Sequence, residues 1–155
     1  MEETDLAYAA GLIDGEGSIG IYKTKYNRCH YGYHYRLLIQ IGMCDAIATT
    51  WMYKNFSGNY GWYDRPGVSY QRMHRWQLND KRASDLLVLL LPYLKTKKVQ
   101  AEIAIEFQKG KRKSSDYPNN TKPLVLMEAD AILAQRISAL KRGKKLDTVT
   151  AADAG

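Results

Sequence analysis

The stretch Ala9-Ala10-Gly11-Leu12-Ile13-Asp14-Gly15-Glu16-Gly17 decides how the rest of the chain is organised. It predicts the end of a short helix that runs into a strand, because Leu6 and Ile13 recur with the alanines at helical spacing. Thr4 or Asp5 is expected to cap the start of this helix, since either side-chain oxygen can accept a hydrogen bond from an unpaired backbone N–H.

Two carboxylates, Asp14 and Glu16, occupy the end of this helix, and Gly15 and Gly17 are expected to break it. A helix C-terminus already carries partial negative charge, so acids are unfavourable there. We expect Asp14 to brace the helix end, and a divalent cation is a natural candidate to offset the remaining charge. By itself the pattern also fits an ordinary amphipathic helix that ends in a glycine turn.

The composition is that of an ordinary globular chain and favours a polyanionic partner. Its 155 residues carry a net charge of +7 and include 12 tyrosines, which can both stack and hydrogen-bond. Cys29 and Cys44 lack CxxC spacing and the three histidines do not cluster, which argues against a zinc site and for a reducing compartment. No apolar run reaches membrane-spanning length and no signal peptide is recognisable, so we expect an intracellular protein without membrane contact.

Capping and periodicity predict the remaining elements. Strands are expected at 18–26 and 33–42, helices at 46–56, 80–91, 95–108 and 124–142, a hairpin with arms at 60–64 and 69–78, and a loop at 110–123. Asp45 and Asp80 are the expected N-caps of the second and third helices. Ile47, Trp51 and Phe56 are the expected apolar residues of the second helix.

Alternation along the strands assigns their faces. The residues expected to point inward are Ile19, Ile21, Tyr35, Leu37, Ile39, Ile41, Trp76 and Leu78. Four antiparallel strands can then form one sheet, with helices on its apolar face and a polar face rich in Tyr, Arg, Gln and His. We therefore expect an α+β protein with a single domain at 1–142 and a disordered basic tail at 143–155.

The nine residues AAGLIDGEG resemble the signature of the LAGLIDADG homing endonucleases. Seven of the nine positions are identical to that signature or differ from it only by Asp to Glu. Residues 91–101, LPYLKTKKVQA, look like the family's second landmark at the proper separation, and the resemblance covers residues 4 to about 108. The resemblance implies an αββαββα fold in which a four-stranded antiparallel sheet forms a DNA-binding saddle, with the helices packed on the other face.

The resemblance also implies a catalytic centre. The last acid of the signature, Glu16, would bind Mg²⁺ or Mn²⁺ with the Gly15 carbonyl as a further ligand, because phosphodiester hydrolysis needs a cation to activate water. Lys97 falls where the family often keeps a basic residue near the scissile phosphates, and Gln40 lies near the same centre. Met43 stands where family members often have a polar water-positioning residue, which leaves that role to Gln40 or Lys97.

The polar face of the sheet and a basic segment are the expected DNA contacts. Arg pairs with guanine and Gln with adenine in the major groove, which a two-stranded ribbon fits. The candidate DNA-contacting residues of the sheet are Tyr22, Thr24, Tyr26, His34, Arg36, Gln40, Gln71, Met73, Arg75 and Gln77. Residues 95–113 hold seven Lys or Arg and two Glu, so Lys111 is expected to contact phosphates, although a solvated face is the usual explanation of such a charge run.

These observations favour a site-specific endonuclease that makes metal-dependent double-strand breaks in a long, near-palindromic site of double-stranded DNA. One copy of the signature implies a homodimer, in which two such helices pack together through Ala7, Ala10 and Gly11. An RNA-binding intron maturase and a non-catalytic DNA-binding transcription regulator on the same fold are the alternatives. Loss of the metal-binding acid would favour the regulator, and the presence of Glu16 argues against it.

Overall fold

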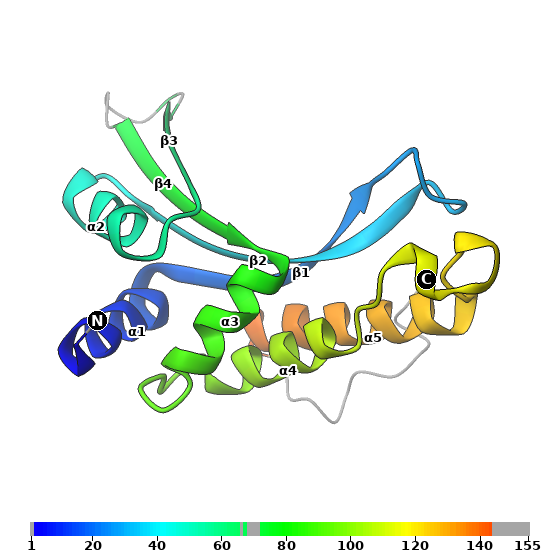
Figure 1. Cartoon of the computed structure of the whole chain (residues 1–155). Helices are drawn as coiled ribbons and strands as arrows, with labels where there is room; N and C mark the ends of the chain where they lie inside the picture. The colour runs from blue at the N-terminus through cyan, green and yellow to red at the C-terminus, as the bar shows by residue number, and fades with distance from the viewer. Residues whose placement is uncertain (1, 66, 68–71, 144–155) are drawn as a thin grey trace.

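The computed structural model describes residues 2–65, 67 and 72–143 (Figure 1). Gln71 and all of the predicted tail except Gly143 lie outside the described residues. The helices and strands are α1 (Glu3–Glu16), β1 (Gly17–Lys25), β2 (Tyr33–Met43), α2 (Ala46–Phe56), β3 (Asn59–Asp64), β4 (Arg72–Asn79), α3 (Asp80–Leu90), α4 (Lys98–Lys109) and α5 (Leu124–Lys141). Two short 3₁₀ turns, Ser114–Asp116 and Pro118–Asn120, interrupt the segment that was predicted as a loop.

The four strands form one sheet in the order β1-β2-β4-β3, and each neighbouring pair is antiparallel. Figure 1 shows the sheet curving into a concave upper face, with the helices on the opposite side. This arrangement confirms the predicted α+β fold and the saddle shape. The concave face is therefore the one long surface of the sheet that no helix covers in this view.

Alternation along the strands was predicted correctly, and it decides which side chains reach the concave face. The inward residues Ile19, Leu37, Ile39, Ile41 and Trp76 have no exposed surface, and Ile21 and Leu78 have 6% and 3%. Trp76 also donates a hydrogen bond from Nε1 to the backbone oxygen of Ser57, at 2.6 Å. Their strand neighbours consequently face the opposite way, as the sequence predicts.

Helix α1 joins β1 without the break that was predicted at Gly15. The helix continues to Glu16 and the strand begins at Gly17, where an added Cβ would lie 2.6 Å from the Cα of Ile13. Only glycine fits this junction, because the strand turns back against the last helical turn. The predicted cap is also corrected: the helix begins after Glu2, whose backbone nitrogen donates to the Asp5 carboxylate at 3.2 Å.

The second and third helices confirm one predicted cap and correct another. Asp45 caps α2 by accepting a hydrogen bond from the Ile47 nitrogen at 2.7 Å. Of the apolar residues expected in this helix, Ile47 is 78% exposed, while Met52 on the opposite side of α2 is fully buried. Asp80 does not cap α3: the N-cap is Asn79, and the Asp80 carboxylate bonds other side chains.

Candidate functional site

The carboxylate of Asp14 joins the end of α1 to the start of α4. It accepts hydrogen bonds from the backbone nitrogens of Lys95 at 2.7 Å and Lys97 at 3.0 Å, and from the Thr96 hydroxyl at 3.0 Å. Burial acts to raise the pKa of Asp14, but these hydrogen bonds outweigh it and hold the pKa below the ordinary value of 3.8. Asp14 is therefore a brace, as the sequence indicated, and is not available to a ligand.

Replacing Asp14 by Ala is expected to lower the free energy of unfolding by roughly 1–3 kcal/mol, because several backbone N–H groups lose a charged acceptor. Since the folded pKa is lowered, this contribution is present above pH 3.8 and is lost as the pH falls through the folded value. Chemical denaturation at pH 7 and pH 3 measures both effects. The control Asp85→Ala removes only an exposed ion pair with Lys81 and should change stability by less than about 0.5 kcal/mol. Equal losses in the two variants would contradict the brace.

Lys97 places a cation at the C-terminal end of α1. Its Nζ donates to the backbone oxygens of Ile13 at 2.9 Å and Asp14 at 2.5 Å. Burial lowers the pKa of Lys97, and the nearby carboxylates of Asp14 and Glu16 partly oppose that shift. The ammonium group thus offsets part of the negative charge of the helix end, which the sequence had attributed to a metal alone.

Glu16 is the carboxylate of this junction that remains open to solvent. Within the described part of the chain, no hydrogen bond or ion pair occupies it, and no three His, Cys, Asp or Glu side chains group as a metal site. Gly15 beside it is also exposed, and an added Cβ would meet nothing within 4 Å. One protomer therefore offers a single exposed carboxylate at the end of α1, next to the cation of Lys97.

Lys141, at the end of α5, approaches the same junction and was missed by the sequence analysis. Its Nζ donates to the Ser18 hydroxyl at 2.8 Å and to the Tyr22 hydroxyl at 2.9 Å. Burial acts to raise the pKa of Tyr22, but the bonds from Lys141 and Ser18 outweigh it and lower the pKa. The Tyr22 ring also covers Gly20, where an added Cβ would lie 2.6 Å from the ring. No local sequence pattern links residues 123 positions apart.

Gln40 lies at the level of this junction, because the register sets it opposite Ser18 on β1 and Gln77 on β4. The Gln77 amide nitrogen donates to the Gln40 amide oxygen at 3.1 Å, so the two side chains hold each other on the concave face. Met43 packs against the core, and it leaves the polar role expected at that position unfilled.

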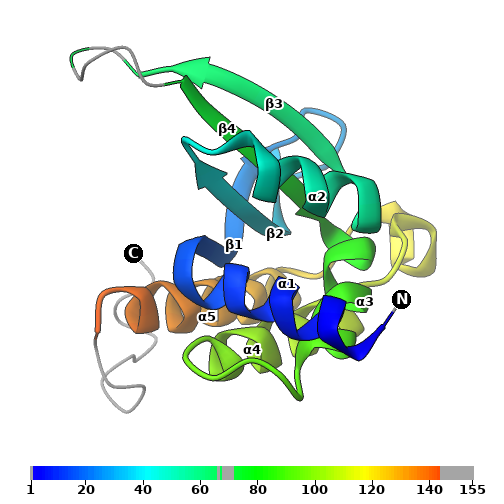
Figure 2. The same cartoon turned by 90° about the vertical axis from the view of Figure 1, so that its left-hand side faces the viewer.

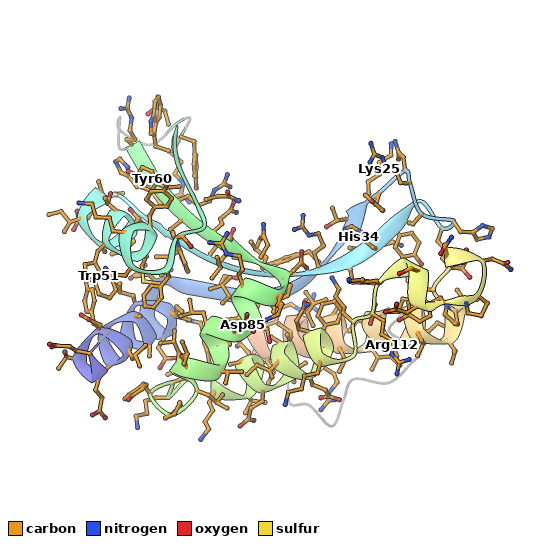
Figure 3. The ribbon with its side chains drawn as sticks, in the orientation of Figure 1. Lys25, His34, Trp51, Tyr60, Asp85 and Arg112 are labelled. Atoms are coloured by element: carbon orange, nitrogen blue, oxygen red, sulfur yellow. The ribbon has the colours of Figure 1, made fainter. Side chains whose placement is uncertain are left out.

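The other predicted DNA contacts are spread along the concave side of the sheet. Register sets Thr24 opposite His34 and Tyr22 opposite Arg36, while Met73 and Arg75 share the face of Gln77 on β4. A hollow of about 190 Å³ opens on this face and is lined by Tyr22, Thr24, Arg36, Leu38, Gln77 and Asn79. Tyr26 lies just beyond β1 with its ring 4.7 Å from that of His34. Figure 3 shows side chains rising at both ends of the saddle, with Lys25 at one end and Tyr60 at the other.

Lys111, which was expected to contact phosphates, forms an ion pair within the protein. Its Nζ bonds the Asp80 carboxylate at 3.0 Å, and its side chain is 26% exposed. Arg36 bonds the same carboxylate, with its Nη2 at 2.6 Å. Lys111 thus helps to neutralise Asp80 in this structure, and its contact with phosphates stays a prediction.

One side of α1 faces outward (Figure 2). Ala7 and Gly11 are exposed there, and an added Cβ on Gly11 would meet nothing within 4 Å. Tyr8 is 49% exposed and packs edge-on against Trp51 of α2 at 4.8 Å. Ala10 lies on the other side of the helix and is fully buried, so the structure removes it from the predicted interface.

None of the helices in the described ranges combines the length and the apolar character needed to span a bilayer.

No protein-family model matches the chain, and no curated protein matches it either. Solved structures do match it, among them several homing endonucleases.

The homing endonuclease I-CvuI, in complex with a DNA target, is 21% identical, with a TM-score of 0.73 over 98% of this chain and 90% of that one. The archaeal intron-encoded homing endonuclease I-Vdi141I, complexed with DNA, is 14% identical, with a TM-score of 0.66 over 96% and 94%. I-TnaI, another homing endonuclease, is 15% identical, with a TM-score of 0.58 over 89% and 96%. At these identities the likeness concerns the fold, and at that level it agrees with the resemblance found in the signature.

Proposed function

We propose that this chain is a site-specific homing endonuclease that makes divalent-metal-dependent double-strand breaks in a long, near-palindromic DNA site. The observation that carries the proposal is the exposed carboxylate of Glu16. It lies at the end of α1, beside the Lys97 cation and next to the concave face of the sheet. Similarity to homing endonucleases along nearly the whole chain supports the same activity.

The residues present fit a magnesium or manganese ion. Mg²⁺ is usually held by one or two carboxylates together with substrate phosphates and water, and Glu16 supplies one exposed carboxylate per chain. Glu16 and the Gly15 carbonyl would hold the ion, which supplies activation of water and neutralisation of phosphate charge. Asp14 takes no part, because backbone and hydroxyl groups of residues 95–97 already occupy it.

Two cations of the protein flank this position and have separate tasks. Lys97 keeps the helix end neutral enough for an anionic phosphate to approach, since its ammonium already bonds two carbonyl oxygens there. Lys141 holds Tyr22 and Ser18 in place, so the first residues of β1 present a fixed surface to the phosphate backbone. Gln40, fixed by Gln77, remains the candidate for positioning water.

A homodimer would supply the second cut. The outward side of α1 carries Ala7 and Gly11, two residues small enough for a second helix to approach closely. Packing two copies there would bring two Glu16 carboxylates to neighbouring positions and would align two concave faces along one duplex. A twofold protein recognises a near-palindrome, because each protomer contacts an equivalent half-site.

The test is selection of a target from a random pool of duplex DNA in EDTA, followed by addition of Mg²⁺ or Mn²⁺ to the enriched site. We expect a near-palindromic sequence to be enriched and then cut on both strands. Enrichment without cleavage would favour a transcription regulator. Failure to enrich any DNA, with binding to a structured intron RNA, would favour a maturase.

A further inference from the structure

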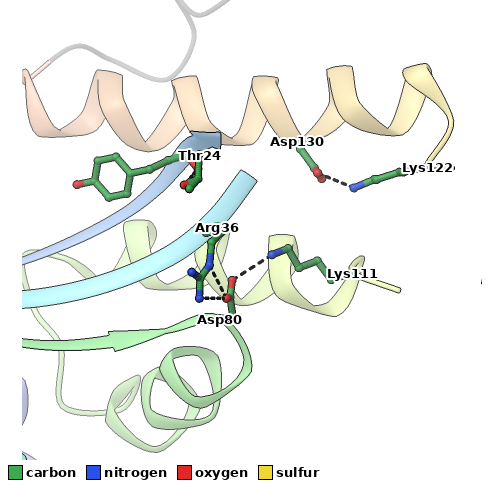
Figure 4. Close-up of polar contacts among 7 residues, drawn as sticks. Thr24, Arg36, Asp80, Lys111, Lys122 and Asp130 are labelled. Carbon is green, nitrogen blue, oxygen red and sulfur yellow. Dashed lines mark hydrogen bonds and ion pairs between the residues drawn. The ribbon is translucent and has the colours of Figure 1, made fainter. Parts of the chain in front are cut away.

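Three charged side chains from distant parts of the chain meet at the edge of the concave face (Figure 4). Arg36 comes from β2, Asp80 begins α3 and Lys111 follows α4. The Asp80 Oδ2 accepts from Arg36 Nε at 2.8 Å and from Nη2 at 2.6 Å, while Oδ1 accepts from Lys111 Nζ at 3.0 Å. Both oxygens of one carboxylate are thus used, each by a different cation.

The contact with Asp80 uses only one edge of the Arg36 guanidinium. A guanidinium group has five N–H donors, and Nε with Nη2 forms its side edge. The end edge consists of Nη1 and the second hydrogen of Nη2, and the ion pair with Asp80 does not use it. The Arg36 side chain is 41% exposed and lines the hollow on the concave face together with Thr24 and Leu38. Within the described part of the chain, a guanidinium that is held on one edge and open on the other therefore borders the surface that would face DNA.

Asp80 is itself held firmly. It directly follows the last residue of β4, and its backbone has a φ of +49°, a conformation that non-glycine residues rarely adopt. Burial acts to raise the pKa of Asp80, but the bond from Arg36 and the charge of Lys111 outweigh it, so the carboxyl group stays ionised. Lys111 supplies the second positive charge, which lets the carboxylate remain half-buried without leaving its other oxygen unpaired.

We propose that Asp80 is a positioning residue for DNA specificity: it holds Arg36 so that the free edge of the guanidinium contacts one guanine in each half-site. Arg contacts the O6 and N7 acceptors of guanine in the major groove through two N–H donors, which is the pair of donors left on this edge. A side chain that is already fixed loses less conformational entropy on binding than a free one. The inference rests on the proposed function, since it needs a DNA duplex on the concave face.

The experiment measures binding of the full chain, without divalent metal, to a library of single-base substitutions of its selected site. Arg36→Ala should reduce discrimination for guanine at one base pair per half-site by roughly tenfold to a hundredfold. Asp80→Asn should reduce discrimination at the same base pair and at no other, and Asp80→Glu should restore part of it. Asp85→Asn is the matched control, because it makes the same chemical change on α3 and removes only an exposed ion pair with Lys81.

The outcomes separate three roles for the cluster. If Asp80→Asn weakened all sequences equally, Asp80 would act only in folding, and the proposal would be overturned. If Arg36→Ala did the same and reduced the salt dependence by about one counterion, Arg36 would be a phosphate ligand, which also overturns it. A wild-type chain with no sequence preference would refute the proposed function itself. A sharp wild-type preference that Asp80→Asn leaves unchanged would refute only this inference.

Discussion

Glu16→Gln is expected to reduce DNA cleavage by about a thousandfold or more, because a bound metal ion supplies several kcal/mol of transition-state stabilisation. The amide keeps the shape of the side chain but loses the charge that a divalent cation needs. Folding should be unaffected, since the Glu16 carboxylate is exposed and holds no hydrogen bond within the described chain. Affinity for the selected DNA should change less than threefold, because most affinity comes from phosphate contacts elsewhere.

The measurement combines a cleavage time course in Mg²⁺ with binding in EDTA. Glu106→Gln provides the matched control, because it makes the same chemical change at an exposed position of α4. The control should cut at the wild-type rate. Cleavage by Glu16→Gln near that rate would refute the assignment of Glu16 as the metal ligand, and loss of binding would show that Glu16 supports the structure instead.

The strand faces could be predicted from the sequence because alternation is a local property. Trp76 and Leu78 fix the inward face of β4, and pairing carries that assignment to its neighbours. The signature likewise located the helix end, since its glycines and acids are consecutive. Both predictions depend on residues that are close together in the chain.

The contacts that join distant segments could not be predicted in the same way. Asp80 has the residue type and the position expected of an N-cap. Its carboxylate instead bonds Arg36, 44 residues earlier, and Lys111, 31 residues later. Lys111 belonged to a run of charge, and the sequence does not say which member of such a run turns inward. A list of the apolar residues in a helix also does not say which of them are buried: Ile47 is exposed, and Met52 is the buried residue.

The exposed side of α1 is the surface on which we place the proposed homodimer. Ala10 is buried in the protomer, so a second chain could meet only the opposite side of α1, where Ala7, Tyr8 and Gly11 are exposed. Trp51 of α2 packs against Tyr8 beside this surface, and Trp51 lines a shallow hollow of α2 together with the exposed Ile47. A largely apolar strip around a glycine is suited to close packing of two helices.

Gly11→Leu is therefore expected to separate the proposed dimer without unfolding the protomer. A Cβ on Gly11 meets nothing within 4 Å, so the protomer accommodates the new side chain, and Leu is a better helix former than Gly by about 1 kcal/mol. A second helix in contact at Gly11 would have no room for it. Sedimentation should give a monomer with an unchanged circular dichroism spectrum, and double-strand cleavage should be lost. Glu102→Leu, which adds the same side chain on the exposed side of α4, should remain a dimer. An intact Gly11→Leu dimer would exclude this side of α1 as the interface.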